Sequence, residues 1–238
     1  SRGIWPKLMT KRWGLWVGFD VMGGVALAAG GFVLTAVVYI LKKDEFKSIV
    51  RPAVLTAFLG YVAVAVGLMA DLGIPWHIWH PAVYWQHHSA LFEVAWCVML
   101  YLTVLALEFL PVPLESTSFL GGLRRFLVNN RLILVILGIM LSTLHQSSLG
   151  TLFLIMPHRL HPLWYSPILP ILFFISAISL GLMMVTLEYL ITHFLYRREI
   201  KVDLLSKLCR SAAWVLIGFL VVRFVDLAVR GSLSALFT

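Results

Sequence analysis

Six long apolar stretches divide the sequence, and short segments with polar and charged residues separate them. Each stretch reaches about 20 residues, the length that an α-helix needs to cross the hydrocarbon core of a bilayer. Backbone N–H and C=O groups find no partners in lipid, so such spans must be helical. We therefore predict an all-α polytopic membrane protein with six transmembrane helices, over residues 13–41, 52–72, 86–109, 132–156, 167–196 and 205–229.

Basic residues concentrate in alternate loops, which predicts how the helices are oriented. The loop after the second predicted helix has no basic residue, and the loop after the fourth has only Arg159. The positive-inside rule therefore puts the other three loops in the cytoplasm. The tail before the first helix, with four basic residues, departs from the rule. The three loops and their flanks carry Lys42, Lys43, Lys47, Arg51, Arg124, Arg125, Arg131, Arg197, Arg198, Lys201, Lys207 and Arg210.

The amino-acid composition supports the membrane class and argues against nucleic-acid binding and thiolate metal sites. Hydrophobic residues make up 61% of the 238 residues and charged residues only 13%, about half the share of a soluble domain. The net charge of +8 comes largely from the loops, so it indicates topology rather than nucleic-acid binding. The only cysteines are Cys97 and Cys209, and without a CxxC motif we predict no zinc or iron–sulfur site.

Ionisable residues inside the spans are the main functional signal, because burying a charge in lipid costs several kcal/mol unless it faces protein or water. Glu93, His145 and Asp20 fall in the outer half of the first four predicted helices, so we predict that they line a shared polar pocket. His87, His88, Gln146 and Asp71 fall near the same depth and are weaker candidates, Asp71 also being explained by an interfacial position.

Four further ionisable residues complete the candidate set. Glu108 and Glu188 fall near the cytoplasmic face, where they either reach the headgroups or belong to a proton path. Arg223 and Asp226 stand three residues apart on the sixth predicted helix, a spacing that favours a structural ion pair. The glycine-rich stretch 23–31 is expected to serve close helix packing.

A polar pocket in an apolar bundle suits a quinone, whose reduction needs two electrons and two protons. Carboxylates and histidine are the natural proton carriers for such a ligand. The electrons would come from a partner subunit or from a haem, with His87 or His88 facing His145 as axial ligands in a cytochrome b-like alternative. A transporter with an ionisable site at mid-membrane is a third possibility, disfavoured by the lack of a visible inverted repeat.

Several motifs in order resemble the NrfD-like family of quinone-interacting membrane subunits. The resemblance covers nearly the whole chain and is closest to the HybB-like branch, the membrane subunits of periplasm-facing nickel–iron hydrogenases. The motifs are WGLWVGFDVMGG (13–24), RPAVLTAFLGY (51–61), LFEVAWCVMLYLTVLALEF (91–109), LHQSSLGTL (144–152), HPLW (161–164) and VVRFVDLAVR (221–230).

The resemblance implies a function that the residues alone do not specify. It implies electron exchange between menaquinone and a periplasmic ferredoxin-like iron–sulfur subunit, and through that subunit a hydrogenase, a multihaem cytochrome or another oxidoreductase. It implies no haem or metal in this chain, a quinone pocket near the periplasmic side, and proton translocation as a further role. Family members have eight to ten spans, so residues 1–165 would form a complete four-helix bundle and residues 166–238 two helices of an incomplete second bundle.

Overall fold

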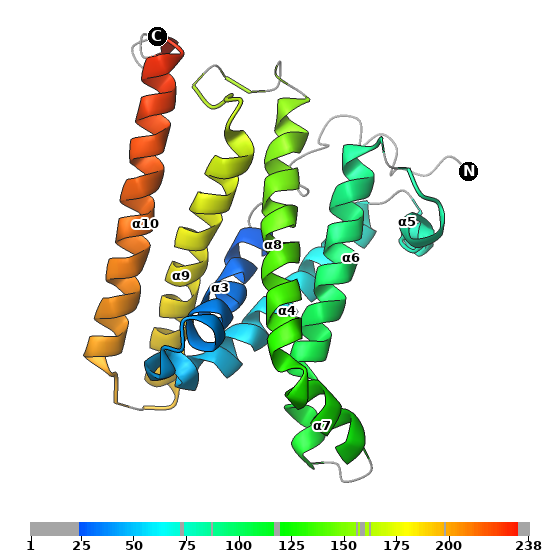
Figure 1. The fold of residues 1–238 in the computed structure, drawn as a ribbon, viewed down its shortest axis with the longest axis vertical. Helices are drawn as coiled ribbons and strands as arrows, with labels where there is room; N and C mark the ends of the chain where they lie inside the picture. Colours follow the sequence, from blue (N-terminus) through cyan, green and yellow to red (C-terminus); the bar gives the residue numbers. More distant parts are fainter. Residues whose placement is uncertain are drawn as a thin grey trace.

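The computed structural model describes residues 24–71, 74–86, 88–116, 120–155, 157, 160–161, 163–197 and 199–232. Every regular element in these ranges is helical. In chain order the elements are α3 Val25–Thr35, η2 Ala36–Ile40, η3 Asp44–Phe46, α4 Lys47–Asp71, η4 Pro75–His77, α5 His80–Val83, α6 Ala90–Phe109, η5 Pro113–Ser116, α7 Gly121–Asn129, α8 Arg131–Leu154, α9 Leu169–Leu195 and α10 Val202–Val229. The helices α6, α8, α9 and α10 run side by side, and α4 crosses obliquely behind them (Figure 1).

Five segments within the described ranges are long and apolar enough to cross a membrane, which confirms the all-helical polytopic class. The prediction of a sixth span over residues 13–41 is only partly covered, because residues 1–23 lie outside the described ranges. What is described of it is a shorter apolar helix, Ala28–Ile40. The five segments are Asp44–Gly67, Phe92–Glu115, Arg131–Leu154, Leu169–Leu195 and Val202–Val229.

Two salt bridges show that the basic loops meet at one end of the bundle, which we call the basic end. Lys207 of α10 lies 2.6 Å from Glu45 of η3, and Arg51 of α4 lies 3.2 Å from Glu115 of η5. Exposed ion pairs of this kind contribute little stability, but they locate the loops relative to one another. α7 lies at the same end in Figure 1, so the charge asymmetry predicted from the sequence is built into the fold.

Glycine allows α3 to pack closely against its neighbours. A Cβ added to Gly30 would lie 2.3 Å from the Gly181 carbonyl oxygen of α9, and one added to Gly31 would lie 2.6 Å from the Ala57 Cβ of α4. Thr35, further along α3, satisfies its hydroxyl by donating to the Gly31 and Phe32 carbonyls. The prediction that the glycine-rich stretch serves packing is therefore confirmed for the described part.

The helices share continuous apolar cores rather than forming two visibly separate units. α9 packs against α3, α8 and α10, while α4 and α6 pack against one another beside α8. The division at residue 165 into two bundles stays a prediction. The core between α3, α4, α6 and α8 consists of Val25, Ala28, Ala57, Tyr61, Val64, Val94, Val98, Tyr101, Leu105 and Leu149.

Candidate functional site

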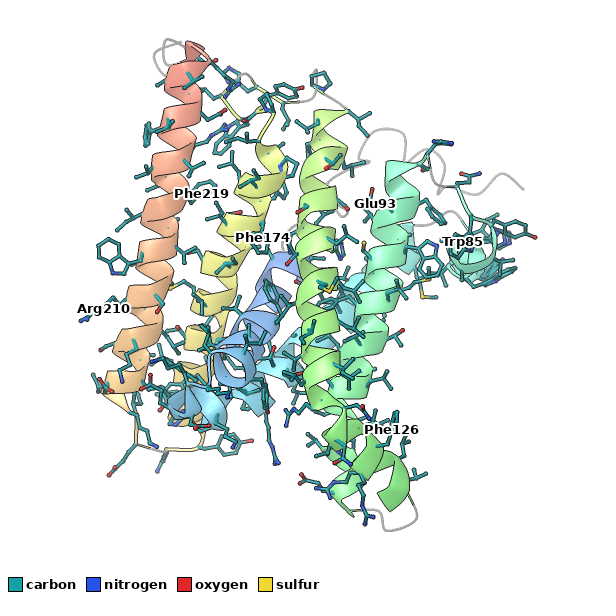
Figure 2. All side chains as sticks on the ribbon, viewed as in Figure 1. Trp85, Glu93, Phe126, Phe174, Arg210 and Phe219 are labelled. Carbon is teal, nitrogen blue, oxygen red and sulfur yellow. The ribbon has the colours of Figure 1, made fainter. Side chains whose placement is uncertain are left out.

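Glu93 lies in the first turn of α6, where the chain enters the helix through a capping serine. The Phe92 N–H donates to the Ser89 hydroxyl across 3.4 Å, and the positive end of the helix dipole favours a carboxylate at this position. The Ser148 hydroxyl of α8 donates to Glu93 across 2.6 Å. Ser148 is buried whereas Glu93 keeps an exposed side, so the carboxylate stands between the bundle interior and the surroundings (Figure 2).

His145 lies three residues before Ser148 on α8 and is completely enclosed, with 0% of its side chain exposed. Its Nδ1 lies 3.1 Å from the hydroxyl of Tyr61 on α4, which is also 0% exposed. The ring of Tyr61 in turn meets that of Tyr101 on α6 edge to face, with centroids 4.6 Å apart. Nε2 of His145 is buried without a hydrogen-bond partner among the described residues.

Gln146 is adjacent to His145 but faces a different part of the bundle. It borders a cavity of about 310 Å³ between α3, α8 and α9, together with Ala26, Phe173, Ser176 and Leu180. The side chain is buried, and within the described part of the chain its Nε2 has no hydrogen-bond partner. Gln146 and His145 therefore present two buried, unpartnered nitrogens on two sides of α8.

The structure says less about the other four residues predicted for the outer half, which are Asp20, Asp71, His87 and His88. Asp20 and His87 lie outside the described residues. Asp71 is the last residue of α4, and His88 is exposed just before α6. Glu93 contacts Ser148, which lies one turn of α8 from His145, but no contact joins Glu93 to His145 directly. The shared pocket and the participation of Asp20 and the others therefore stay predictions.

Glu108 lies near the basic end of α6, where its side chain is only 7% exposed. Its Oε1 has no hydrogen-bond partner among the described residues. Arg131 at the start of α8 is close enough to act electrostatically on Glu108, and its guanidinium stacks 4.5 Å from the ring centroid of Tyr39. Glu188 of α9 is half-buried beside Thr56 of α4, so the two carboxylates lie on different helix contacts.

Arg223 and Asp226 form the ion pair that their spacing predicted, with 3.4 Å between Nη1 and Oδ2. Asp226 also pairs with Arg230 at 2.9 Å. A second Arg223 nitrogen donates to the Leu163 carbonyl, which fastens the α8–α9 loop to α10. This cluster therefore stabilises the contact between the α8–α9 loop and α10, at the end opposite the basic loops.

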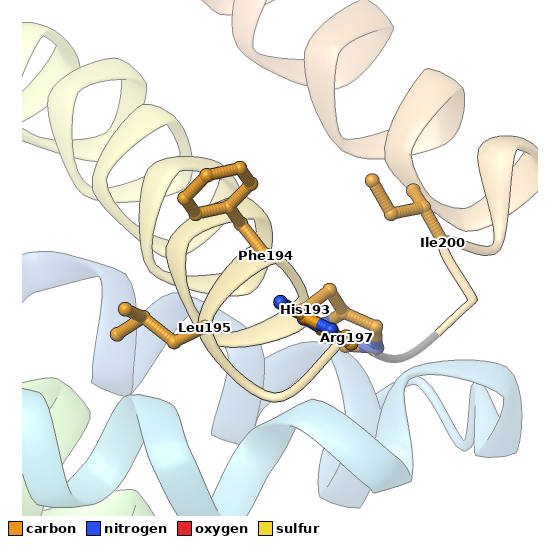
Figure 3. A pocket seen from close by; sticks show the side chains of 5 residues that line it. All are labelled: His193, Phe194, Leu195, Arg197 and Ile200. Atoms are coloured by element: carbon orange, nitrogen blue, oxygen red, sulfur yellow. The ribbon is translucent and has the colours of Figure 1, made fainter.

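Neither cysteine is in a disulfide, and the described residues contain no group of three or more His, Cys, Asp or Glu arranged to hold a metal ion. An open hollow of about 590 Å³ lies at the turn between α9 and α10 (Figure 3). This turn is at the basic end, whereas Glu93 lies toward the opposite end (Figure 2). The hollow is lined by His193, Phe194, Leu195, Arg197 and Ile200.

Sequence reasoning missed Tyr61 and Tyr101, although it did note that Ser148 shares a polar turn with His145. A tyrosine inside an apolar span, away from either membrane surface, carries a hydroxyl that needs a buried partner. That signal was present in the sequence, but the identity of the partner depends on how the helices are rotated against one another.

An all-helical multi-pass membrane protein with a buried polar cluster between three of its helices is the class that this geometry defines. A family model, described as polysulphide reductase, NrfD, matches residues 9–236, and the chain belongs to this family. No solved structure matches the chain.

Three curated relatives illustrate the family. The chain is 46% identical over 222 residues to a protein of Nitratidesulfovibrio vulgaris, covering 90% of this chain and 57% of the relative. It is 34% identical over 233 residues to the probable Ni/Fe-hydrogenase 2 b-type cytochrome subunit of Escherichia coli, covering 94% and 58%. It is 31% identical over 225 residues to the menaquinone reductase integral membrane subunit of N. vulgaris, covering 90% and 53%. The chain thus spans little more than half the length of these relatives.

Proposed function

We propose that this protein is the quinone-reactive membrane subunit of a respiratory redox complex in the prokaryotic inner membrane. It exchanges electrons between menaquinone and a periplasmic ferredoxin-like iron–sulfur subunit, which leads to a hydrogenase, a multihaem cytochrome or another oxidoreductase. Two relatives with hydrogenase and menaquinone reductase in their names support this assignment. The basic end of the bundle is then cytoplasmic and the end with Glu93 periplasmic.

The observation that carries the proposal is the pair of buried polar residues His145 and Ser148, with the partly exposed Glu93 bonded to Ser148 at their edge. If the Tyr61 hydroxyl donates to Nδ1, then Nε2 of His145 bears the other proton and is a buried donor without an acceptor among the described residues. A quinone ring oxygen is an acceptor of the kind that this nitrogen lacks. The unsatisfied Nε2 atom therefore supports the placement of a quinone head group in the outer half of the bundle.

The bound quinone supplies the two-electron chemistry, and the chain supplies position and protons. His145 holds a proton at Nε2. The Tyr61 hydroxyl is bonded to the other ring nitrogen, Nδ1, and so fixes the orientation of the imidazole. Ser148 holds the Glu93 carboxylate at the edge of the cluster, where it can exchange protons with water. Gln146 offers a further amide donor, toward the cavity between α3, α8 and α9.

Quinone binding by the purified complex tests the proposal directly. A naphthoquinone analogue should bind to the complex that contains the full-length subunit, and be reduced when an artificial donor feeds the partner subunit. His145→Ala should abolish the reduction while the complex still assembles. A wild-type complex that neither binds nor reduces the analogue would refute the proposal.

A haem-binding anchor is the second candidate, because the E. coli relative has b-type cytochrome in its name. His145 already uses Nδ1 with Tyr61, so only its enclosed Nε2 is left as a ligand. A Soret band from the isolated subunit, lost in His145→Ala, would favour this alternative.

A further inference from the structure

The hollow at the turn between α9 and α10 lies where the membrane-spanning part of α9 ends. α9 is one of the five helices long and apolar enough to cross the membrane. The side chains of Phe194, Leu195 and Tyr196 at its end are all largely exposed. Aromatic and apolar side chains exposed at the end of a span lie where the hydrocarbon gives way to the headgroups. The hollow, which Phe194 and Leu195 line, is therefore at headgroup depth.

An exposed apolar stripe runs along α9 and ends at the wall of the hollow. Its members recur every three or four residues, so they share one face of the helix. From Leu180 to Leu195 the stripe extends about 22 Å along the helix axis, more than the roughly 15 Å of hydrocarbon in one leaflet. An acyl chain can therefore contact α9 through the whole depth of its leaflet. The members of the stripe are Leu180, Met183, Leu187, Ile191, Phe194 and Leu195.

Arg197 contributes a cation to the lining of the hollow. No carboxylate among the described residues forms a salt bridge with it, whereas the nearby Lys207 pairs with Glu45 and Asp203. The backbone of Arg197 is left-handed, with φ at 49°, a conformation that glycine usually adopts after a helix. An arginine in that conformation is locally strained, so its side chain needs an explanation other than the turn itself.

His193 lies one turn of α9 before Arg197 and adds a second polar group to the lining. Its Nδ1 lies 2.8 Å from the Tyr189 carbonyl oxygen, which can only accept a hydrogen bond, so Nδ1 carries a proton. Nε2 is then left to donate to a ligand when the ring is protonated. In Figure 3 His193 and Arg197 lie at the end of α9, and Ile200 lies on the segment that leads into α10.

The surrounding sequence favours a ligand with net negative charge. Residues 197–210 contain five basic residues and only two acidic ones. One of the acidic residues, Asp203, is already paired with Lys207. A zwitterionic headgroup would bring its own cation into this basic turn, whereas an anionic headgroup would not.

We infer that this hollow binds the phosphate of an anionic glycerophospholipid, whose acyl chains lie along the exposed stripe of α9. Arg197 donates to the phosphate oxygens, a charge-assisted contact for which the planar guanidinium is well suited. Free phosphate offers the same oxygens, but without acyl chains it makes no use of the stripe. The inference goes beyond the proposed function, because it involves neither quinone nor electron transfer.

The site is tested on the full-length protein, purified with its partner subunits and freed of lipid. Native mass spectrometry measures the dissociation constants of dioctanoyl phosphatidylglycerol and, as the zwitterionic control, dioctanoyl phosphatidylcholine. The wild type should bind phosphatidylglycerol at least about fivefold more tightly, the usual effect of one basic residue near an anionic surface. Arg197→Gln should remove this preference, and Arg197→Lys should keep most of it.

Two further variants separate lipid binding from folding and from overall charge. Arg197→Gly suits the left-handed backbone, so it removes the cation while the turn is kept. Arg125→Gln removes an exposed arginine from α7 at the same end of the bundle and should keep the wild-type preference. Thermal unfolding in detergent checks that every variant is folded. Inorganic phosphate, added at the concentration of the lipid, should not displace phosphatidylglycerol.

Each contrary result overturns the inference. Equal affinity of the wild type for the two lipids would exclude an anionic site. A preference for phosphatidylglycerol that survives in folded Arg197→Gln and Arg197→Gly would exclude Arg197 as its origin. Displacement by inorganic phosphate would identify a site for free phosphate instead of a lipid. None of these results depends on quinone reduction, so the proposed function is judged separately.

Discussion

The Ser148 hydroxyl donates to the Glu93 carboxylate across 2.6 Å and so joins α8 to α6 at the end opposite the basic loops. The buried Ser148 hydroxyl would cost about 1–3 kcal/mol if it were left without a partner. The contact thus fixes a carboxylate that would otherwise be free to turn toward lipid or water. Substitutions can separate the contribution of this hydrogen bond to assembly from the contribution of Glu93 to proton transfer.

Glu93→Gln should slow quinone turnover by well over about tenfold, because the amide keeps the shape but cannot carry a titrating proton. The amide oxygen still accepts from Ser148, so the complex should assemble and take electrons from an artificial donor. Steady-state quinone reduction and donor oxidation measure the two steps separately. A wild-type rate in Glu93→Gln and in His145→Ala would mean that the quinone site lies elsewhere.

Tyr61→Phe should lower the stability of the subunit by about 1–3 kcal/mol, because it leaves Nδ1 of His145 buried without a partner. Thermal unfolding in detergent measures the loss. Tyr84→Phe removes a hydroxyl at a largely exposed position, keeps the ring, and serves as the matched control. Equal melting temperatures for both variants would show that the Tyr61–His145 contact contributes no net stability.

Gly181→Ala should destabilise the bundle by about 1–3 kcal/mol or more, because the new methyl group would lie 2.3 Å from the Gly30 nitrogen. Neither backbone can yield without separating α3 from α9. Gly218→Ala on α10 adds the same methyl group where no atom lies within 4 Å, so it should be tolerated. The thermal unfolding of the two variants in detergent is measured and compared. The close contact would be disproved by a Gly181→Ala protein as stable as Gly218→Ala.

Single cysteines at Ile78 and Gly122 should be labelled from opposite sides of the membrane. Ile78 lies in the segment between η4 and α5, and Gly122 lies exposed on α7 at the basic end. Cys209 is exposed and is first replaced by serine so that it adds no background. Labelling with a membrane-impermeant maleimide on intact and opened cells gives the answer. If both positions react from one side, the predicted orientation is wrong.

The purified subunit, separated from its partners, should contain neither iron nor haem. The sequence has only two cysteines, and the Nδ1 atom of His145 is already hydrogen-bonded to the Tyr61 hydroxyl. Metal analysis and the absorption spectrum between 400 and 600 nm (roughly the haem range) check this. Stoichiometric iron would refute it, and a Soret band that disappears in His145→Ala would identify the axial ligand.

The spans could be predicted from the sequence because lipid leaves a helix as the one available structure for an apolar run. The fourth span was predicted over residues 132–156, and α8 occupies Arg131–Leu154. The third was predicted to start at residue 86, but α6 starts at Ala90, because Ser89 adopts extended backbone and caps the helix. A hydropathy profile averages over many residues, so it does not detect a capping residue such as Ser89.

The site was predictable only where its contacts are local in sequence. Arg223 and Asp226 are one turn apart on one helix, so their pairing follows from spacing alone. The bond from Arg223 to the Leu163 carbonyl joins residues far apart in the chain and depends on how α10 meets the α8–α9 loop. Tyr61 and His145 likewise lie 84 residues apart on different helices, so their contact depends on how α4 and α8 are placed in the bundle.

The contact between Gly30 and Gly181 also constrains the order of events during synthesis. About 150 residues separate the two glycines, and a ribosome adds about 5–20 residues per second, so α9 emerges about 8–30 s after α3. For that interval the small-residue face of α3 has no α9 to pack against and is covered by lipid or by the insertion machinery. A nascent chain stalled before α9 would therefore expose this face, which makes it a natural target for membrane quality control.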